Sequence, residues 1–359
     1  MSTESLHESY FSMLLKGIGG RSVAQALENL LERKINIPQG TRSTASDSQN
    51  HLREFLRNEA TRDAGFPRIL SDADADFLGG SFARHTKIWP LDDIDIYFPL
   101  EGANLFYMNG GIRLPYTLLS DDSRLGNPLL LPKWTSGGYV SSAKLIQGFA
   151  EVLKRHNPRT EVRTGGQSIS VRMTHGETQD SDGLGYDIVP CFSLKPDNSN
   201  EFEFYLMPNG RGGWMRTNPK LDADITDILQ RYNGNLYRKL VKLIKYWNSV
   251  RLDRAFPSYY VELALSRAFY NRKANNQAVG SLSEGLSLGF EALESAYKAG
   301  SLTPWIAEAP LVPKPNLSVS QVVALGLAQI GASLAWLLQQ NGKEDEAVTQ
   351  WSKVFGETL

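Results

Sequence analysis

The first 215 residues alternate strand-like stretches with amphipathic helices, and the remainder has a helical pattern throughout. The strand-like stretches lie at 74–81, 92–100, 161–173, 184–194 and 201–208. From Asn218-Pro219 onward, apolar residues recur at helical spacing, and Pro and Gly fall mainly between the blocks. The pattern predicts a two-lobed α+β chain, with a mixed sheet in residues 1–215 and a helical domain in residues 216–359.

Capping residues and helix breakers predict where several helices begin and end. Ser46 and Gln49 have the spacing of a capping box, which predicts that a charged helix begins there. Residues 139–158 have a helical pattern that Asn157-Pro158 ends. Residues 318–338 are strongly apolar but contain Ser, Gln and Gly throughout, which predicts a buried helix rather than a membrane span.

Charge and cysteine content limit the classes of function. The chain has 359 residues and a formal net charge of −1, so no strong overall field favours nucleic acid or membranes. Cys191 is the single cysteine, which excludes a disulfide framework or a cysteine zinc cluster within the chain. The N-terminus lacks the pattern of a signal peptide. We expect a soluble, cytoplasmic protein that neither engages membranes nor binds duplex nucleic acid stably.

Three aspartates lie in or just before the apolar stretch 94–98. Charges in such a strand are costly unless a cation or solvent compensates them. Because side chains alternate between the two faces of a strand, Asp93 and Asp95 share one face, whereas Asp92 points the other way and is not expected to be a ligand. A carboxylate pair of this kind suits Mg²⁺. The alternative is a solvated edge strand with charges on its wet face.

Two further features belong to the same hypothesis. Gly80-Ser81 follows an apolar strand and precedes Asp93 by 12 residues, so its backbone N–H groups and hydroxyl can meet an anion. A two-metal site also requires a third carboxylate. Asp187 is the candidate, because it is the one acid in the apolar stretch 184–194. The alternative for Asp187 is a polar residue near a strand end.

This arrangement resembles the nucleotidyltransferase superfamily with a polymerase-beta-like palm. The stretch "GGSFARHTKIWPLDDIDIYF" is similar to the cGAS/DncV-like nucleotidyltransferases, or CD-NTases. So are "FYLMPNGRGGWMRTNPK", "LYRKLVKLIKYWN" with "FPSYYVELA", and "TQWSKVFGETL". The resemblance covers most of the chain from about residue 45. It implies a nucleotidyltransferase palm in residues 1–215, with N-terminal helices, and a helical nucleotide-binding domain in residues 216–359.

The resemblance also implies roles for the palm residues. Gly80 and Ser81 would hold the β- and γ-phosphates of a donor nucleotide. Asp93 and Asp95 would bind two Mg²⁺ ions, with Mn²⁺ as a possible substitute, and Asp187 would ligate the ion nearest the acceptor hydroxyl. One position departs from the family pattern, because His85 stands where a glycine is usual.

In the helical half, the resemblance points to four nucleotide-binding residues. Lys242 and Lys245 lie three apart on one helix and would contact the triphosphate, although solvated lysines are the alternative. Ser258, at a helix start after Pro257, would contact phosphate. Tyr259 would stack on a base, and core packing is its alternative.

The function implied is the joining of ATP, alone or together with other NTPs, into a cyclic di- or trinucleotide second messenger with release of pyrophosphate. The family context is bacterial anti-phage (CBASS) defence, in which a regulatory protein partner is possible. Two alternatives stay open: an enzyme that makes linear oligonucleotides or extends RNA, and a non-catalytic nucleotide-binding module.

Overall fold

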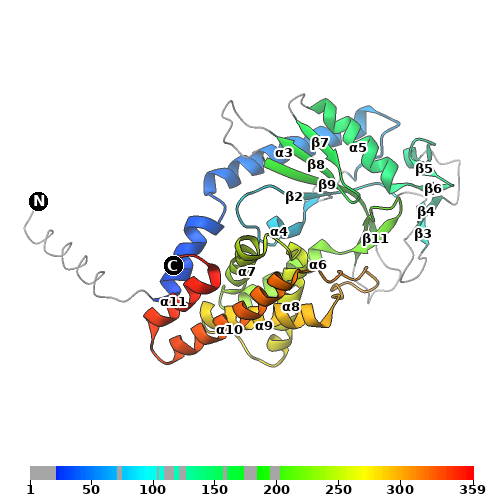
Figure 1. Cartoon of the computed structure of the whole chain (residues 1–359). Coiled ribbons are helices and arrows are strands. Elements are labelled where there is room, and N and C mark those ends of the chain that lie inside the picture. The colour runs from blue at the N-terminus through cyan, green and yellow to red at the C-terminus, as the bar shows by residue number, and fades with distance from the viewer. Residues whose placement is uncertain are drawn as a thin grey trace, which may run out of the picture. The chain divides into compact units, whose positions relative to one another are not determined.

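The computed structural model describes residues 22–70, 75–102, 105–108, 117–120, 127–156, 160–173, 184–194 and 203–359. The chain divides into two compact units, each formed from separate segments (Figure 1). One unit comprises residues 37–228 and 301–313 and contains the sheet, and we call it the palm unit. The other comprises residues 1–36, 229–300 and 314–359 and is the helical unit. The predicted α+β fold class is confirmed.

The palm unit is built on a seven-stranded mixed sheet. Its strands are β1 (Phe77–Leu78), β2 (Ile94–Pro99), β7 (Glu161–Thr164), β8 (Ile169–Met173), β9 (Leu184–Leu194), β10 (Phe204–Pro208) and β11 (Trp214–Thr217). The order is β1-β2-β9-β10-β11, with β8 paired to β9 and β7 to β8. Strands β2 and β9 are parallel, and the other pairs are antiparallel. Since β2 lies between β1 and β9, the edge-strand alternative for residues 94–99 is excluded.

Smaller elements complete the palm unit. Strands β3 (Leu105–Met108) and β4 (Thr117–Ser120) form one hairpin, and β5 (Thr135–Ser136) and β6 (Tyr139–Val140) form another. The helices of this unit are α3 (Gln39–Arg62), the short α4 (Gly80–Ala83), η2 (Pro128–Leu130), α5 (Ser142–His156) and most of α6 (Pro219–Tyr232).

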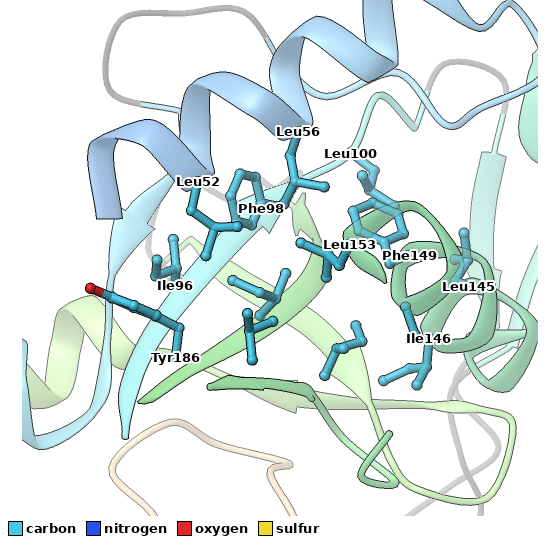
Figure 2. Packing of buried hydrophobic residues seen from close by; sticks show 14 of the residues in the cluster. Leu52, Leu56, Ile96, Phe98, Leu100, Leu145, Ile146, Phe149, Leu153 and Tyr186 are labelled. Atoms are coloured by element: carbon cyan, nitrogen blue, oxygen red, sulfur yellow. The ribbon is translucent and has the colours of Figure 1, made fainter. Parts of the chain in front are cut away.

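One face of the sheet packs against α3 and α5 (Figure 2). Ile94, Ile96 and Phe98 of β2 are completely buried in this core. They meet Leu52 and Leu56 of α3, and α5 contributes a second set of apolar side chains. The alternation expected for β2 therefore agrees with the burial of its apolar positions, and it turns Asp95 to the opposite face.

The opposite face of the sheet has a different composition. Tyr97, Val189, Cys191, Tyr205 and Met207 form a small separate apolar cluster on it. Burial raises the pKa of the Cys191 thiol and of the Tyr97 hydroxyl, with the Asp95 charge adding to the effect on Tyr97. These groups are therefore neutral packing residues. The row that contains Asp95 contributes polar residues to the same face.

The helical unit contains α2 (Val23–Leu30), the π-helical turn η1 (Leu31–Ile35), α7 (Tyr237–Leu252), α8 (Ser258–Ala274), α9 (Leu282–Ala299), α10 (Val319–Gln340) and α11 (Glu344–Phe355). Helices α7 and α9 approach closely because α9 carries glycines at the contact. A Cβ at Gly289 would lie 2.4 Å from Ile244 Cδ1, and one at Gly285 equally close to Leu240. Trp247 packs edge-on against Phe290 across the same contact.

The division between the units differs from the expected boundary between residues 215 and 216. Most of α6 belongs with the sheet, because Asn218 Nδ2 donates to the Glu203 carbonyl and Leu221 packs on the palm core. The segment 22–36 belongs with the helical unit, since α2 packs on α9 and α11. The two compact units therefore do not follow a single boundary in the sequence.

Two helix predictions also need correction. Helix α3 begins at Gln39 after Pro38 rather than at Ser46, because Ala45 is fully buried and extends the apolar stripe toward the N-terminus. Helix α10 was predicted to be buried, but it is buried only along one side. By length and composition alone, α10 would also be able to cross a membrane.

Candidate active site

A row of polar residues crosses the sheet on the face opposite the main core. Asp95 of β2 is in register with Asp187 of β9, Asp187 with Ser170 of β8, and Ser170 with Arg163 of β7. Residues in register on neighbouring strands point to the same side. Asp95 and Asp187, separated by 92 positions in the sequence, are therefore adjacent carboxylates on one surface.

Ser170 holds the Asp187 carboxylate. Its hydroxyl donates a hydrogen bond of 2.5 Å to Asp187 Oδ1. Asp187 is half-buried, and Ser170 is exposed. A hydroxyl that donates to a carboxylate fixes its rotamer and leaves its second oxygen available to other partners. Sequence reasoning missed Ser170. In residues 169–173 apolar and polar residues alternate, and Ser170 is one of the polar positions, which was a signal.

The Gly79-Gly80-Ser81 turn lies directly against Asp95. The Gly79 N–H donates to the Asp95 carbonyl at 2.9 Å. Gly80 has a φ of +60°, and a Cβ there would be 1.6 Å from Asp95 Oδ2. Both observations require glycine at position 80. The predicted phosphate-binding turn and one predicted metal ligand are thus in contact.

The chain after Ser81 folds back and closes this turn. The Ser81 carbonyl accepts hydrogen bonds from the backbone N–H groups of Thr86 and Lys87, at 2.9 and 3.0 Å. His85, the residue before Thr86, has a φ of +58°. That left-handed conformation favours glycine, so the departure from the family pattern at this position retains the turn at a cost in backbone strain.

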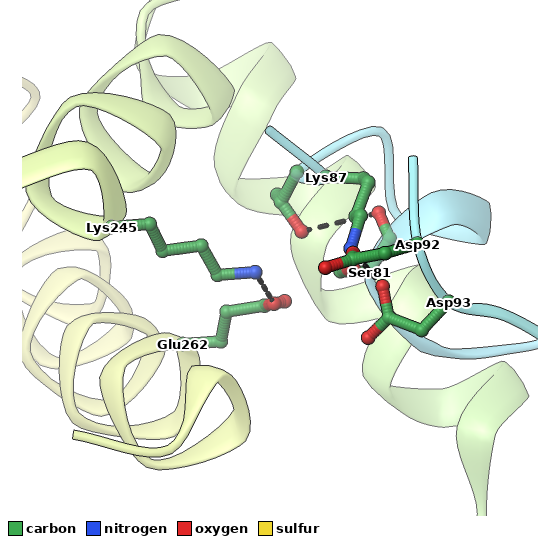
Figure 3. Close-up of polar contacts among 7 residues, drawn as sticks. Ser81, Lys87, Asp92, Asp93, Lys245 and Glu262 are labelled. Atoms are coloured by element: carbon green, nitrogen blue, oxygen red, sulfur yellow. Dashed lines mark hydrogen bonds and ion pairs between the residues drawn. The ribbon is translucent and has the colours of Figure 1, made fainter. Parts of the chain in front are cut away.

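Lys87 pairs with both aspartates that precede β2 (Figure 3). Its ammonium lies 2.5 Å from Asp92 Oδ1 and also contacts Asp93 Oδ1. Asp93 comes just before the strand, which begins at Ile94, and its side chain is 53% exposed. No pattern in the sequence indicated Lys87, whose ammonium forms an ion pair with the Asp93 carboxylate.

Asp76 anchors the start of the same loop. It lies one residue before β1 and is buried, and its carboxylate pairs with Arg53 and Arg57 of α3. Arg53 also donates to the Asp76 carbonyl at 2.5 Å. Burial lowers the pKa of the Arg53 guanidinium. This clamp fixes β1, and therefore Gly79 to Ser81, to the long helix α3.

A hollow of about 300 Å³ adjoins Asp187. Its lining includes Asp187 and Ser170, and also Arg163, Arg172 and Glu161 from β7 and β8. Arg172 belongs to a second row, in register with Gly185 on one side and Glu161 on the other. Gly185 has no room for a side chain, because a Cβ would lie 1.9 Å from the Asp92 carbonyl oxygen. The hollow therefore combines the Asp187 carboxylate with two guanidinium groups.

The residues predicted in the helical unit have varied environments. Lys245 is buried and ion-paired with Glu262 (Figure 3), and Lys242 is nearly buried and donates to Asn36 Oδ1 at 2.9 Å. Neither lysine is solvated, so that alternative is excluded. Ser258 is the exposed first residue of α8, as its position after Pro257 predicts. Tyr259 is half-buried.

The donor groups of the palm suit a hard divalent cation. Asp95 and Asp187 present carboxylates side by side, and Asp93 already holds the ammonium of Lys87. Within the described ranges, no group of three or more His, Cys, Asp or Glu side chains has the arrangement of a metal site. A cation bound to all three aspartates would therefore require Asp93 to turn from Lys87 toward Asp95.

The chain is similar to proteins of known name and known structure. No family model matches the chain. A protein of Bacillus cereus (strain VD146) named "Probable cyclic nucleotide synthase" is 24% identical over 344 residues, which are 94% of this chain and 97% of that protein.

Two solved structures of CdnC from E. coli MS115-1 share the fold. The CdnC:HORMA-deltaN complex has a TM-score of 0.57 at 18% identity, over 94% of this chain and 98% of that chain. CdnC with ATP has a TM-score of 0.56 at 19% identity, over 93% and 98%. The chain thus shares the fold of CdnC and resembles a protein named as a cyclic nucleotide synthase, in agreement with the CD-NTase resemblance that the sequence motifs indicated.

Proposed function

We propose that this chain is a Mg²⁺-dependent nucleotidyltransferase that joins NTPs into a cyclic di- or trinucleotide and releases pyrophosphate. The observation that carries the proposal is the in-register pair Asp95 and Asp187 with Gly80-Ser81 packed against Asp95. A carboxylate pair beside a glycine turn provides a cation site next to a phosphate site, which is what transfer of a nucleotidyl group requires.

Asp93, Asp95 and Asp187 would hold the divalent ions, as the resemblance implies. Bound Mg²⁺ would neutralise the negative charge that develops on the attacking and leaving oxygens. The contribution of Ser170 is to keep the Asp187 carboxylate oriented through the 2.5 Å hydrogen bond. The backbone at Gly80 and the Ser81 hydroxyl would bind the β- and γ-phosphates of the donor.

The acceptor would lie in the hollow beside Asp187. Its hydroxyl oxygen forms a bond to the α-phosphorus of the donor, and the bond from that phosphorus to the bridging oxygen breaks. Pyrophosphate leaves with the bonding electron pair, and the Asp187 carboxylate accepts the hydroxyl proton. Arg163 and Arg172, which line the hollow, would neutralise phosphates of the acceptor.

The remaining parts of the proposal rest on the resemblance and on the neighbours. ATP is the donor we propose, since one neighbour is a structure of CdnC with ATP. A regulatory protein partner and a cytoplasmic role in anti-phage defence are proposed likewise, and CdnC has been solved with a HORMA partner. Lys242, Lys245, Ser258 and Tyr259 stay predicted nucleotide contacts. For Lys245, the buried ion pair with Glu262 is a competing structural role.

A pyrophosphate-release assay with purified protein, NTPs and Mg²⁺ or Mn²⁺ tests the proposal. Asp95→Asn and Asp187→Asn should each lower the rate by about 100-fold or more, because each removes a charge at the site of transfer. Asp224→Asn, an exposed position on α6, is the matched control and should retain activity. Activity that persists in both site variants would overturn the mechanism.

The two alternatives predict different outcomes. A linear product would lose its terminal phosphates to phosphatase and then be degraded by exonuclease, whereas a cyclic product has no terminal phosphate and would be unchanged by phosphatase. Saturable ATP binding without pyrophosphate release, in the presence of an activating partner, would favour the non-catalytic module.

A further inference from the structure

Helix α10 of the helical unit presents a continuous apolar stripe to solvent. We define the α10 stripe as its seven large apolar residues that are between 40% and 82% exposed: Val319, Val322, Val323, Leu327, Ile330, Leu334 and Leu337. Single exposed apolar residues are common on soluble proteins, but an aligned set of seven on one helix is not. The stripe therefore requires an explanation.

The opposite side of α10 already has its packing partners. Leu325, Ala328, Gly331, Ala332 and Ala335 are buried, and α10 makes its main contacts with α9 and α11. A Cβ at Gly331 would lie 2.8 Å from Val354 of α11, so this contact is close. The α10 stripe is thus additional to the buried core of the unit.

The spacing of the stripe is that of a helix–helix seam. Val323, Leu327, Ile330 and Leu334 are separated by 4, 3 and 4 residues, and Leu337 continues the pattern. This is the a/d spacing of helices that pack along their length. The stripe exposes on the order of 700 Å² per chain, close to the roughly 800 Å² per partner of a standard protein interface.

The composition of α10 is not that of a helix that lies on a membrane surface. Helices that lie on membranes carry Lys or Arg on their polar face. The segment Val319–Gln340 contains no charged residue. A partner helix must therefore be uncharged along its contact line as well, since an unpaired charge opposite this stripe would be buried without compensation.

The stripe is also complementary to itself. The 4-3-4 spacing of its central residues is the same in both directions along the helix. When two copies of α10 run antiparallel, Leu327 of each faces Ile330 of the other, and Val323 faces Leu334. A two-fold axis relates such a pair, which is the symmetry of most homodimers. We propose that two copies of this chain associate through antiparallel α10 helices.

Analytical ultracentrifugation of the full chain over a dilution series tests this proposal. The wild type should show a monomer–dimer equilibrium, and Leu327→Glu or Ile330→Lys alone should weaken dimerisation at least about tenfold, because each charge would be buried unpaired. Leu311→Glu is the matched control, since Leu311 is a comparably exposed leucine outside α10, and it should leave dimerisation unchanged. Circular dichroism checks that each variant is folded.

A mixing experiment tests the antiparallel pairing itself. In a heterodimer of the Leu327→Glu and Ile330→Lys chains, the new carboxylate faces the new ammonium, and the unchanged Ile330 and Leu327 face each other. Mixing the two should restore dimers that neither chain forms alone. This readout depends on opposite charges meeting, so a variant that is merely misfolded cannot produce it.

Three outcomes would overturn the proposal. The first is a wild type that stays monomeric over the whole dilution series. If that monomer also co-sediments with phosphatidylcholine–phosphatidylglycerol vesicles through α10, the stripe binds lipid instead of a second copy. The second is a dimer that Leu327→Glu leaves intact. The third is loss of dimers in both single variants without recovery on mixing, which would indicate a different pairing. None of these measurements uses catalytic activity, so they are independent of the proposed function.

Discussion

Asp95 and Asp187 show how a pair of residues far apart in the sequence becomes one site. Their adjacency depends on the parallel pairing of β2 with β9 in one register. A shift of one residue would turn Asp187 to the opposite face, toward the apolar core. Buried Ile188 and Tyr186 on either side of Asp187 make that shift costly. The hydrophobic residues therefore specify the position of the carboxylate.

Lys87 is predicted to compete with the divalent cation for Asp93. Removal of its charge by Lys87→Met should lower the Mn²⁺ concentration needed for half-saturation, measured by calorimetric titration, because the carboxylate no longer has an internal partner. Lys133→Met, an exposed lysine of the same unit, should leave the titration unchanged. Weaker Mn²⁺ binding in Lys87→Met would show that Lys87 supports the cation site instead.

His85 is predicted to hold backbone strain in the turn after Ser81. Its φ of +58° costs a residue with a Cβ more than it costs glycine. His85→Gly should therefore be more stable than His85→Ala by about 1 kcal/mol. Because both variants remove the imidazole, the difference between their denaturant midpoints isolates the backbone term. Equal midpoints would contradict the strained conformation.

At the scale of elements, the contact of α3 with β1 depends on Asp76. Asp76→Ala leaves two arginines beside a buried, empty position, so it should lower the free energy of unfolding by about 3 kcal/mol or more. The comparison variant is Glu59→Gln, which removes the more exposed pair with Arg155 and should cost under about 1 kcal/mol. Guanidinium titrations measure both. Similar, small costs would show that the clamp is unimportant.

The last residue of α5 predicts a pH dependence for the palm unit. Burial, with the nearby charge of His51, lowers the pKa of His156 below its ordinary value of about 6.5. The unfolded chain then binds a proton at His156 more tightly than the folded chain does. The free energy of unfolding therefore rises as pH increases from the folded pKa of His156 to about 6.5, and this contribution is lost on acidification. Melting temperatures should show a smaller drop between neutral and mildly acidic pH in His156→Phe than in the wild type. An identical drop in both proteins would exclude His156 as the source.

The sequence predicted those elements whose limits are set locally. The alternation in residues 94–98 predicts that Ile94, Ile96 and Phe98 of β2 face the main core, and Asn157-Pro158 predicts the end of α5 at His156. The start of α3 was mispredicted, because a capping-box spacing at Ser46 is a weak signal beside the tertiary burial of Ala45. The alignment of Asp187 with Asp95 was a hypothesis that spacing alone could not test.

Contacts that form only in the folded chain explain what the sequence did not predict at the site. Lys87 meets Asp93, and Ser170 meets Asp187, only through the turn after Ser81 and the pairing of β8 with β9. The ion pair of Lys245 with Glu262 joins two helices of the helical unit. Such contacts depend on tertiary packing, and no local pattern in one sequence specifies them.

At the scale of the whole molecule, the two units are discontinuous in sequence. Residues 301–313 return to the palm unit between α9 and α10, and Arg216 pairs there with Glu308. The segment 22–36 belongs with the C-terminal helices. A boundary drawn at a single position, such as 215/216, cannot describe this division. Truncations at that position would remove part of each unit.

Mass spectrometry of the reaction product tests the central claim most directly. The purified protein is incubated with an equimolar mixture of the four NTPs and Mg²⁺, and the reaction mixture is then treated with phosphatase. The treated mixture should contain a cyclic di- or trinucleotide. The corresponding mixture with the Asp95→Asn protein should contain no cyclic product. A product that is linear, or a cyclic product that forms equally in the Asp95→Asn protein, would contradict the account.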